Sequence, residues 1–163
     1  MIRAATVALF VSILISSGSP VAAQENLSIH KLEWQRHRFE ATNPSLIGDR
    51  SQPIQPLNTR LAKPRALKAT VFGYLPYWSS SDYLRFDLLT HIAAFSVEVN
   101  ADGTLGNDHG WPWTSLINRA HSQGVKVILV ATLFDGAKIS TLISSQSNRQ
   151  RFFANIKAKM LEG

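Results

Sequence analysis

Residues 69–78 of this 163-residue chain have the sequence ATVFGYLPYW, in which a short β-forming run ends abruptly. Val, Phe and Tyr favour strands because their side chains pack well on a pleated surface. Pro76 cannot donate a hydrogen bond to a neighbouring strand, so we expect the strand to end there. The stretch therefore predicts a buried first strand with two aromatic residues, Tyr77 and Trp78, directly after its carboxyl end.

Downstream of this stretch, two more apolar runs predict strands. Residues 88–97 form one run, and residues 125–133 form another that is almost entirely Val, Ile and Leu. Such a continuous run is typical of a strand buried on both faces. Between residues 79 and 87 we expect a loop with one helical turn.

Helical spacing appears in three segments. Residues 112–123 place Leu and Ile on one face, with Pro112 at the first helical position and Gly124 as the C-terminal cap. Residues 148–161 place four apolar side chains on one expected stripe: Phe152, Phe153, Ile156 and Met160. Near the N-terminus, residues 28–41 predict a third helix with Ser28 as its N-cap.

This order of strands and helices predicts an α/β fold with a parallel sheet and right-handed crossovers. The pattern fits an open doubly wound sheet or the first three βα units of a (β/α)8 barrel. An open sheet of that kind usually has a glycine-rich phosphate turn after its first strand. The turn here, residues 76–79, contains no glycine. Its two aromatic side chains suit stacking on a sugar better than binding a pyrophosphate.

Four motifs resemble those of family-18 glycoside hydrolases, the chitinase-like superfamily. Residues 71–78, VFGYLPYW, resemble the first-strand signature G-Y-x-P-Y-W, and residues 89–96, LTHIAAFS, resemble the second-strand signature L-T-H-I-x-x-x-F. AHSQGVKVIL at 120–129 and RQRFFANI at 149–156 resemble A-H-x-x-G-x-K-V-x-x and R-x-x-F-x-x-N-I. All four occur in the family's order within residues 70–163.

The resemblance implies a (β/α)8 barrel that hydrolyses β-1,4-linked N-acetylglucosamine polymers by the substrate-assisted retaining reaction. In that reaction a Glu protonates the leaving oxygen, the substrate's acetamido group attacks the anomeric carbon, and an Asp orients that group. These carboxylates lie in a D-G-x-x-x-D-x-E motif on the fourth strand, and the printed sequence does not contain this motif. Because a barrel needs about 250 residues, we expect an incomplete (β/α)8 barrel, the catalytic residues beyond Gly163, and no activity from the 163 residues alone.

Five residues are predicted to bind the glycan. The resemblance places Tyr74 and Phe95 on the floor of the sugar site, with packing in the barrel core as the alternative. Tyr77 and Trp78 are predicted to form a stacking wall for pyranose rings, with a structural lid as the alternative. Glu98 follows the second strand rather than the fourth, so we do not expect it to donate the catalytic proton but to hydrogen-bond the glycan, with a solvated position as the alternative.

Other polar and aromatic residues are weaker candidates for a role in the site. Trp111 and Trp113 are expected to pack against the following helix, and His91 and His121 to be structural. Asp135 fits a ligand contact and a turn with Gly136 equally well. The His and Asp residues show no metal-ligand spacing, so we expect neither a metal nor a cofactor.

One departure from the family bears on specificity. The family's third strand commonly ends S-x-G-G, whereas residues 130–134 here are VATLF. Glycine lets a sugar approach the backbone closely, so bulkier residues are expected to reshape the floor. Peptidoglycan or another N-acetylglucosamine glycan is therefore an alternative to chitin.

Charge and composition exclude several other functions. The net charge is +6, but residues 24–69 account for +4 of it and residues 70–163 for only +1. No dense Lys/Arg run is present, so we do not expect nucleic-acid binding. The absence of cysteine excludes a disulfide scaffold and a thiol nucleophile.

The N-terminal third divides into two expected segments. Residues 1–23 have a basic start, an apolar stretch and small residues at the end, which predicts a signal peptide, with a membrane anchor as the alternative. Residues 24–69 contain four prolines and predict a lead-in, either a linker or an arm that wraps the domain at 70–163. The protein is expected to be secreted or periplasmic, and free of the membrane after signal cleavage.

Two alternatives to a glycosidase remain open. One is a non-catalytic carbohydrate-binding relative of the same fold, which differs from the enzyme at the Glu of the fourth-strand motif. The other is a standalone α/β binding module, which predicts a compact domain at 70–163 without sugar affinity.

Overall fold

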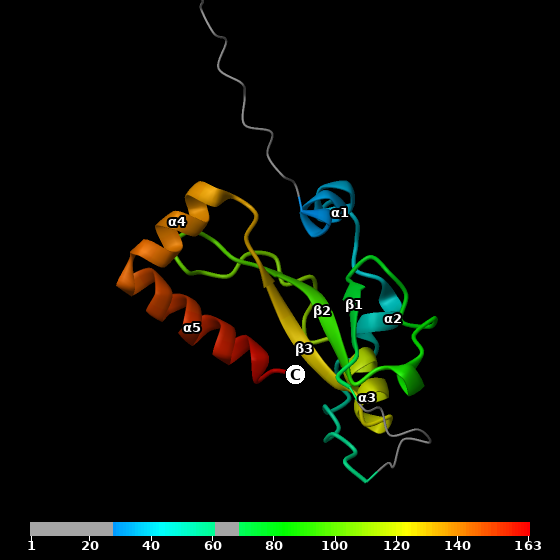
Figure 1. Ribbon diagram of the computed structural model, residues 1–163. Coiled ribbons are helices and arrows are strands. Elements are labelled where there is room, and N and C mark those ends of the chain that lie inside the picture. Colours follow the sequence, from blue (N-terminus) through cyan, green and yellow to red (C-terminus); the bar gives the residue numbers. More distant parts are fainter. Residues whose placement is uncertain (1–27, 61–68) are drawn as a thin grey trace, which may run out of the picture.

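The computed structural model of the protein describes residues 28–60 and 69–163, so the predicted signal peptide lies outside the described residues. Its centre is a three-stranded parallel sheet in the order β1-β2-β3, formed by β1 (Phe72–Pro76), β2 (His91–Glu98) and β3 (Lys126–Thr132) (Figure 1). The three predicted strands are all present, and the α/β class is confirmed.

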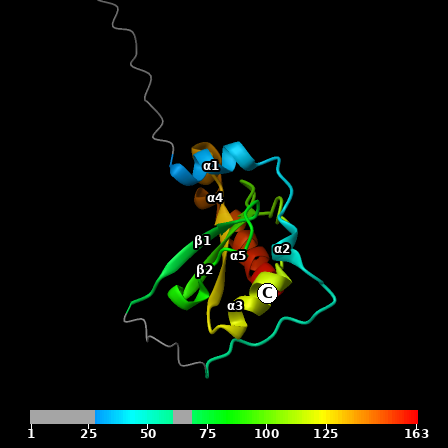
Figure 2. The ribbon, with the colours of Figure 1, turned by 90° about the vertical axis from the view of Figure 1, so that its right-hand side faces the viewer.

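Helices flank the sheet on several sides. In chain order, α1 (Ile29–His37) and α2 (Pro44–Ile47) precede β1. The 3₁₀ turn η1 (Phe86–Leu88) lies between β1 and β2, and α3 (Thr114–Ser122) lies between β2 and β3. The helices α4 (Gly136–Ser144) and α5 (Gln146–Met160) follow β3. Figure 2 shows α1 and α4 near the carboxyl ends of the strands and α3 towards their amino ends. Within the described ranges, none of the helices combines the length and the apolar character needed to cross a membrane.

The hydrophobic core lies on one face of the sheet. Leu75 of β1 and Ile92 of β2 pack there with Leu116 and Ile117 of α3 and Leu46 of α2. Trp111 and Trp113 complete this core, as predicted. The indole Nε1 of Trp111 donates to the carbonyl of Lys159, and this bond attaches the end of α5 to the core.

The opposite face of the sheet is open. Phe72 and Tyr74 on β1 are 53% and 56% exposed, and Ile128 on β3 is 38% exposed. Tyr74 and Ile128 lie in register through Ala93 of β2, so they share this face. The prediction that β3 is buried on both faces is wrong for the described structure, because α1 covers this second face around Tyr74 and Phe95 but Ile128 of β3 stays exposed.

Two helix predictions need correction. The helix α3 begins at Thr114, not at Pro112, because Trp113 is its N-cap and accepts the first helical hydrogen bond from Ile117. The C-terminal prediction is confirmed, since Gly124 has a φ of 68°. On α5, Phe152 and Ile156 of the predicted stripe are partly buried, whereas Phe153 and Met160 are 62% and 57% exposed, so the described structure covers only part of the stripe.

The helix α4 was not predicted from the sequence. Asp135, which fitted a ligand contact or a turn, is its N-cap: the carboxylate accepts a hydrogen bond from the backbone N–H of Lys138 at 2.9 Å. This bond lowers the pKa of Asp135. The signal was an Asp before a run with Ile139, Leu142 and Ile143 at helical spacing.

Residues 28–60, which we call the N-terminal arm, follow the outside of the sheet. The prediction of a helix capped by Ser28 is confirmed, because the Ser28 hydroxyl accepts from the Lys31 N–H at 3.2 Å. Farther along, the backbone N–H of Asn43 donates to the Tyr77 carbonyl at 2.7 Å, and that of Asn58 donates to the His121 carbonyl at 2.9 Å. The segment boundaries after residues 23 and 69 stay predictions.

Candidate functional site

The five predicted glycan-binding residues gather at the carboxyl ends of β1 and β2. Tyr74 lies on β1, and Tyr77 and Trp78 lie in the turn that follows it. Phe95 and Glu98 lie in the C-terminal half of β2. Because the two strands are parallel, their carboxyl ends lie side by side, and the Tyr77 N–H donates to the Phe95 carbonyl at 2.9 Å.

Tyr74, Tyr77, Trp78 and Phe95 form an aromatic cluster. Trp78 meets Tyr77 edge-on, with ring centroids 4.7 Å apart and planes at 90°, and meets Phe95 in the same way at 6.0 Å and 89°. Edge-to-face contacts of this kind are favoured because they match the positive ring edge to the negative face. The two contacts fix the Trp78 ring, so the direction of its face is set by the fold.

Phe95 and Tyr77 are the two buried members of the cluster, with exposed fractions of 4% and 0%, and Tyr77 makes further contacts beneath it. Its side chain is fully buried, its ring stacks on His109 at 3.5 Å, and its hydroxyl donates to the His37 carbonyl at 2.8 Å. Burial raises the pKa of Tyr77 to about 12, and the negative charge of Glu98 acts in the same direction. In this arrangement Tyr77 supports the cluster from beneath and does not offer a ring face to a sugar.

Glu98 is shared between two possible donors. Its Oε1 accepts a hydrogen bond from the indole Nε1 of Trp34 at 3.1 Å, and the same oxygen lies 3.7 Å from Nε2 of His109. The Glu98 side chain is about one-third exposed, whereas that of His109 is almost completely buried.

His109 is a residue that the sequence analysis did not single out. It has a φ of 49°, and its Nε2 makes no hydrogen bond within the part of the chain that the structure describes. Burial lowers the pKa of His109, against the opposite effects of Glu98 and Asp108. The only sequence signal was its place in the turn-forming stretch NDHG at 107–110, where the Asn107 and Asp108 side chains bond the backbone.

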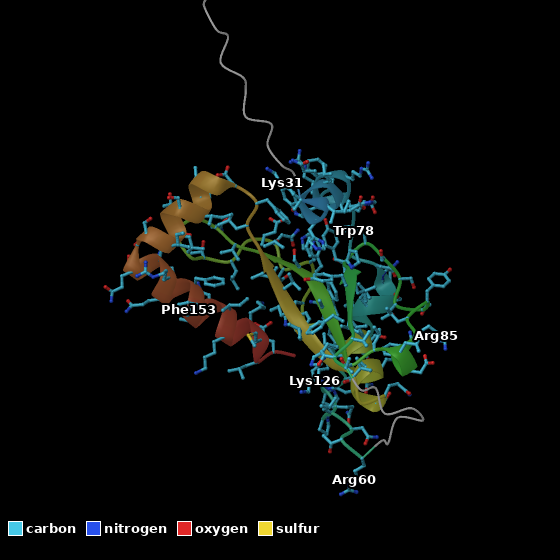
Figure 3. All side chains as sticks on the ribbon, viewed as in Figure 1. Lys31, Arg60, Trp78, Arg85, Lys126 and Phe153 are labelled. Atoms are coloured by element: carbon cyan, nitrogen blue, oxygen red, sulfur yellow. The ribbon has the colours of Figure 1, made fainter. Side chains whose placement is uncertain are left out.

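The helix α1 lies across this whole site (Figure 1). The His30 ring stacks on Tyr74 at 4.8 Å and 30°, and the His37 ring stacks on Trp78 at 4.5 Å and 10°. His30 also lies 5.9 Å from Phe95. Figure 3 shows Lys31 and Trp78 at this end of the molecule and Lys126, at the start of β3, at the opposite end.

Two cavities open on either side of α1. A cavity of about 210 Å³ lies between α1 and the aromatic cluster, with His30 and Glu33 on one wall and Trp78 on the other. A larger one of about 560 Å³ lies over the ends of β2 and β3, and Trp34, Glu98, Asn100, Asp135 and Lys138 supply much of its lining. Aromatic faces can stack on the C–H face of a sugar, and the polar groups can bond its hydroxyl and amide groups.

The residues that replace the glycines of the third-strand motif also reach this site. The ring of Phe134 lies 5.6 Å from that of Trp34 and 6.4 Å from that of Phe95. Thr132 bonds the buried Ser96 hydroxyl at 2.8 Å. Thr132 stands at one of the glycine positions, and Phe134, which follows these positions, fills space beside the cluster.

The remaining predicted polar residues have structural partners. Nδ1 of His121 lies 2.6 Å from the carbonyl of Gln55, and Nδ1 of His91 lies 2.8 Å from the hydroxyl of Thr90. Across residues 28–60 and 69–163, no three His, Asp or Glu side chains are grouped so as to hold a metal ion.

Comparison with solved structures connects the fold to carbohydrate enzymes. The chain is similar to a chitinase from Bacteroides thetaiotaomicron, with 28% identity and a TM-score of 0.52, over 57% of this chain and 32% of that one. This likeness confirms the resemblance to chitinase-like glycoside hydrolases that the motifs predict. The chain thus spans about a third of the length of that chitinase. Neither a protein-family profile nor a curated protein matches the chain.

Two further solved structures show weaker likeness. They are the chitinase RmChi1 from Rhizomucor miehei (27% identity, TM-score 0.46, 52% of this chain and 27% of that one) and the Bacillus cereus spore cortex-lytic enzyme SleL (26%, 0.39, 57% and 25%). At these TM-scores they support no conclusion about this chain.

Proposed function

We propose that this chain forms the first three βα units of a secreted or periplasmic, family-18-type glycoside hydrolase that acts on β-1,4-glycans containing N-acetylglucosamine. One observation carries the proposal. The aromatic cluster and Glu98 lie together at the carboxyl ends of parallel strands, in a chain that is similar to a chitinase. Active sites of (β/α)8 barrels lie at that end of the strands.

The open face of the sheet supports the barrel part of the proposal. Phe72, Tyr74 and Ile128 are large apolar side chains on this face, and all three are substantially exposed. Burying such a side chain stabilises a protein by about 1.5–3 kcal/mol. Side chains of this kind fill the interior of a barrel, so closure of the sheet by further strands at its edges would account for their presence.

In this proposal the described residues bind and orient the glycan. Tyr74 and Trp78 stack on the apolar faces of pyranose rings, and Glu98 accepts a hydrogen bond from a hydroxyl or acetamido N–H group. The proton-donating Glu and the orienting Asp of the substrate-assisted reaction belong to a motif that the printed sequence does not contain. We therefore propose glycan binding for these 163 residues and hydrolysis for a protein that also carries that motif.

Calorimetric titration with chitotetraose tests the proposal, with cellotetraose as the ligand that lacks acetamido groups. We expect chitotetraose to bind in preference to cellotetraose, and Tyr74→Ala to weaken its binding about tenfold, the effect of losing roughly 1.4 kcal/mol of stacking. Tyr83→Ala is the matched control, because Tyr83 is exposed in the loop after β1, away from the cluster. Equal affinity for the two ligands, or equal effects of the two substitutions, would contradict the proposal.

A purely carbohydrate-binding role for this chain is the second candidate, because the aromatic cluster and Glu98 could bind a glycan without a catalytic carboxylate. Chromatography of chitotetraose incubated with the chain tests what both candidates share, namely that these 163 residues do not hydrolyse the glycan. We expect no shorter products. Their appearance would mean that residues within 1–163 supply the catalytic carboxylate.

A further inference from the structure

The face that α1 turns towards the sheet carries three ring side chains. His30, Trp34 and His37 are spaced at i, i+4 and i+7, which places them on one side of a helix. Together they contact all five predicted glycan-binding residues. His30 meets Tyr74 and Phe95, Trp34 bonds Glu98, and His37 meets Trp78 with its ring and Tyr77 with its carbonyl.

These contacts occupy the surfaces that a sugar would use. The imidazole of His37 lies almost parallel to the Trp78 ring at 4.5 Å, so that ring face has no room for a pyranose. The cavity that remains between α1 and the cluster is about 210 Å³. Typical ligand pockets measure roughly 300–1,000 Å³, so a glycan chain needs α1 to move before it can lie on the cluster.

The helix α1 is attached to the sheet by contacts that can break and let the helix move away. None of its residues is buried, and Ile29, its most apolar side chain, points into solvent. Phe39, Glu40 and Ala41 after it are also exposed. Bonds to the core begin at the last residue of α1, where the His37 carbonyl accepts from the Tyr77 hydroxyl, and continue at Thr42 and Asn43, which bond the His109 and Tyr77 carbonyls at 2.8 and 2.7 Å.

The bond between Trp34 and Glu98 also leaves a polar atom unsatisfied. While Oε1 of Glu98 accepts from Trp34, the buried Nε2 of His109 lies 3.7 Å from the same oxygen and makes no hydrogen bond among the described residues. A buried polar group without a partner disfavours the arrangement that contains it. Release of Trp34 frees Glu98 to move the short distance to His109.

We propose that α1 is an autoinhibitory segment that binds the glycan site of its own chain and must be displaced by the glycan. The inference rests on the proposed function and assigns a regulation to that same site. A segment tethered by a few residues competes at an effective concentration in the millimolar range. The apparent dissociation constant of a glycan is then raised by the inverse of the fraction of molecules in which α1 is open.

The test compares two double variants of the whole chain by calorimetric titration with chitotetraose. His30→Ala/His37→Ala removes both stacking rings and leaves the Tyr77 bond to the His37 carbonyl in place. Gln35→Ala/Arg36→Ala is the matched control, because both side chains are exposed on the other side of the same helix. We expect the first variant to bind about tenfold more tightly than the wild type, and the control to bind like the wild type.

A third variant tests the inference without removing a ring side chain from α1. Trp34→Phe keeps an aromatic ring but removes the N–H that Glu98 accepts, so we expect binding about two- to threefold tighter than that of the wild type. Amide hydrogen exchange gives an independent readout. Chitotetraose should speed exchange at residues 33–37 of the wild type, because it displaces the helix.

The outcomes separate the two proposals. If the wild type binds chitotetraose but the His30→Ala/His37→Ala variant binds equally or more weakly, or if the ligand slows exchange in α1, the helix is a wall of the site and the autoinhibition is wrong. If neither the wild type nor any variant binds, the proposed function fails and the inference fails with it.

Discussion

The helices α1 and α2 belong to the same N-terminal arm, yet they are held in opposite ways. The nine-residue α1 buries none of its residues and is held through rings, one indole hydrogen bond and the bond from the Tyr77 hydroxyl to the His37 carbonyl. The four-residue α2 buries Leu46 completely and is fixed at its start by the backbone bond from Asn43 to Tyr77. Length therefore does not determine attachment. Apolar burial secures α2, whereas α1 is held by contacts that a ligand with flat apolar faces can replace.

The largest expected effect is at α2. Leu46→Ala removes a fully buried side chain from the core and should lower the free energy of unfolding by about 2–5 kcal/mol. Ile29→Ala on α1 is the control, since Ile29 is 64% exposed and the substitution should change stability by less than about 0.5 kcal/mol. Urea unfolding followed by circular dichroism measures both. Similar losses for the two variants would show that α1 is as firmly packed as α2.

The next largest expected effect is a dependence of stability on pH, and it arises from His109. The carbonyl of His109 accepts a bond from Thr42, in the anchored part of the arm. Burial holds the pKa of His109 below its usual 6.5 despite Glu98 and Asp108, so the unfolded chain binds a proton first as pH falls. Stability is therefore full above pH 6.5 and declines below it, by at most about 1.4 kcal/mol per pH unit.

Thermal melting between about pH 5 and 7 checks this sign. His109→Asn is the informative variant because Asn tolerates the positive φ that His109 adopts. It should melt at a lower temperature than the wild type but with a flatter pH dependence over that interval. An unchanged slope would assign the pH dependence to other groups.

Tyr77 contacts both regions of the arm, with its hydroxyl at His37 and its carbonyl at Asn43, and loss of the hydroxyl should have a smaller effect. Tyr77→Phe removes the bond to the His37 carbonyl and should cost about 1 kcal/mol of stability. The phenol should also disappear from the alkaline absorbance titration near pH 12. Tyr83→Phe, in an exposed loop, is the control and should leave the melting temperature unchanged.

The smallest global effect is expected at the start of α1. Ser28→Ala removes the N-cap bond to Lys31 and should destabilise the first turn of the helix by about 1 kcal/mol. Because α1 opens locally, this loss should appear as faster amide exchange at residues 31–34 while global melting stays the same. A matching fall in the global melting temperature would mean that α1 unfolds together with the core.

The sequence predicted the features that depend on local chemistry. Pro76 and the aromatic residues around it marked the end of β1, and Gly124 marked the end of α3. It also brought Tyr74, Tyr77, Trp78, Phe95 and Glu98 to one place, because parallel strands must align their carboxyl ends. Their proposed role in binding stays a prediction.

Other features depend on contacts between distant segments and had no local signal. Trp34 and Glu98 are 64 residues apart in the chain, and nothing in the polar sequence of α1 indicates which surface it covers. The unpartnered nitrogen of His109 likewise results from the packing of Tyr77 and Glu98 around it. The Val/Ile/Leu run of β3 predicted burial on both faces, but burial depends on what covers the strand and not on the strand alone.

The most direct test of glycan binding at the carboxyl ends of β1 and β2 is an NMR titration with chitotetraose that follows the four indole N–H signals. Signals of Trp34 and Trp78 should shift on binding, because one lies on the displaced helix and the other in the aromatic cluster, while those of the core residues Trp111 and Trp113 should stay in place. No shift at Trp34 and Trp78 under saturating ligand, or equal shifts at all four, would contradict a glycan site beneath α1.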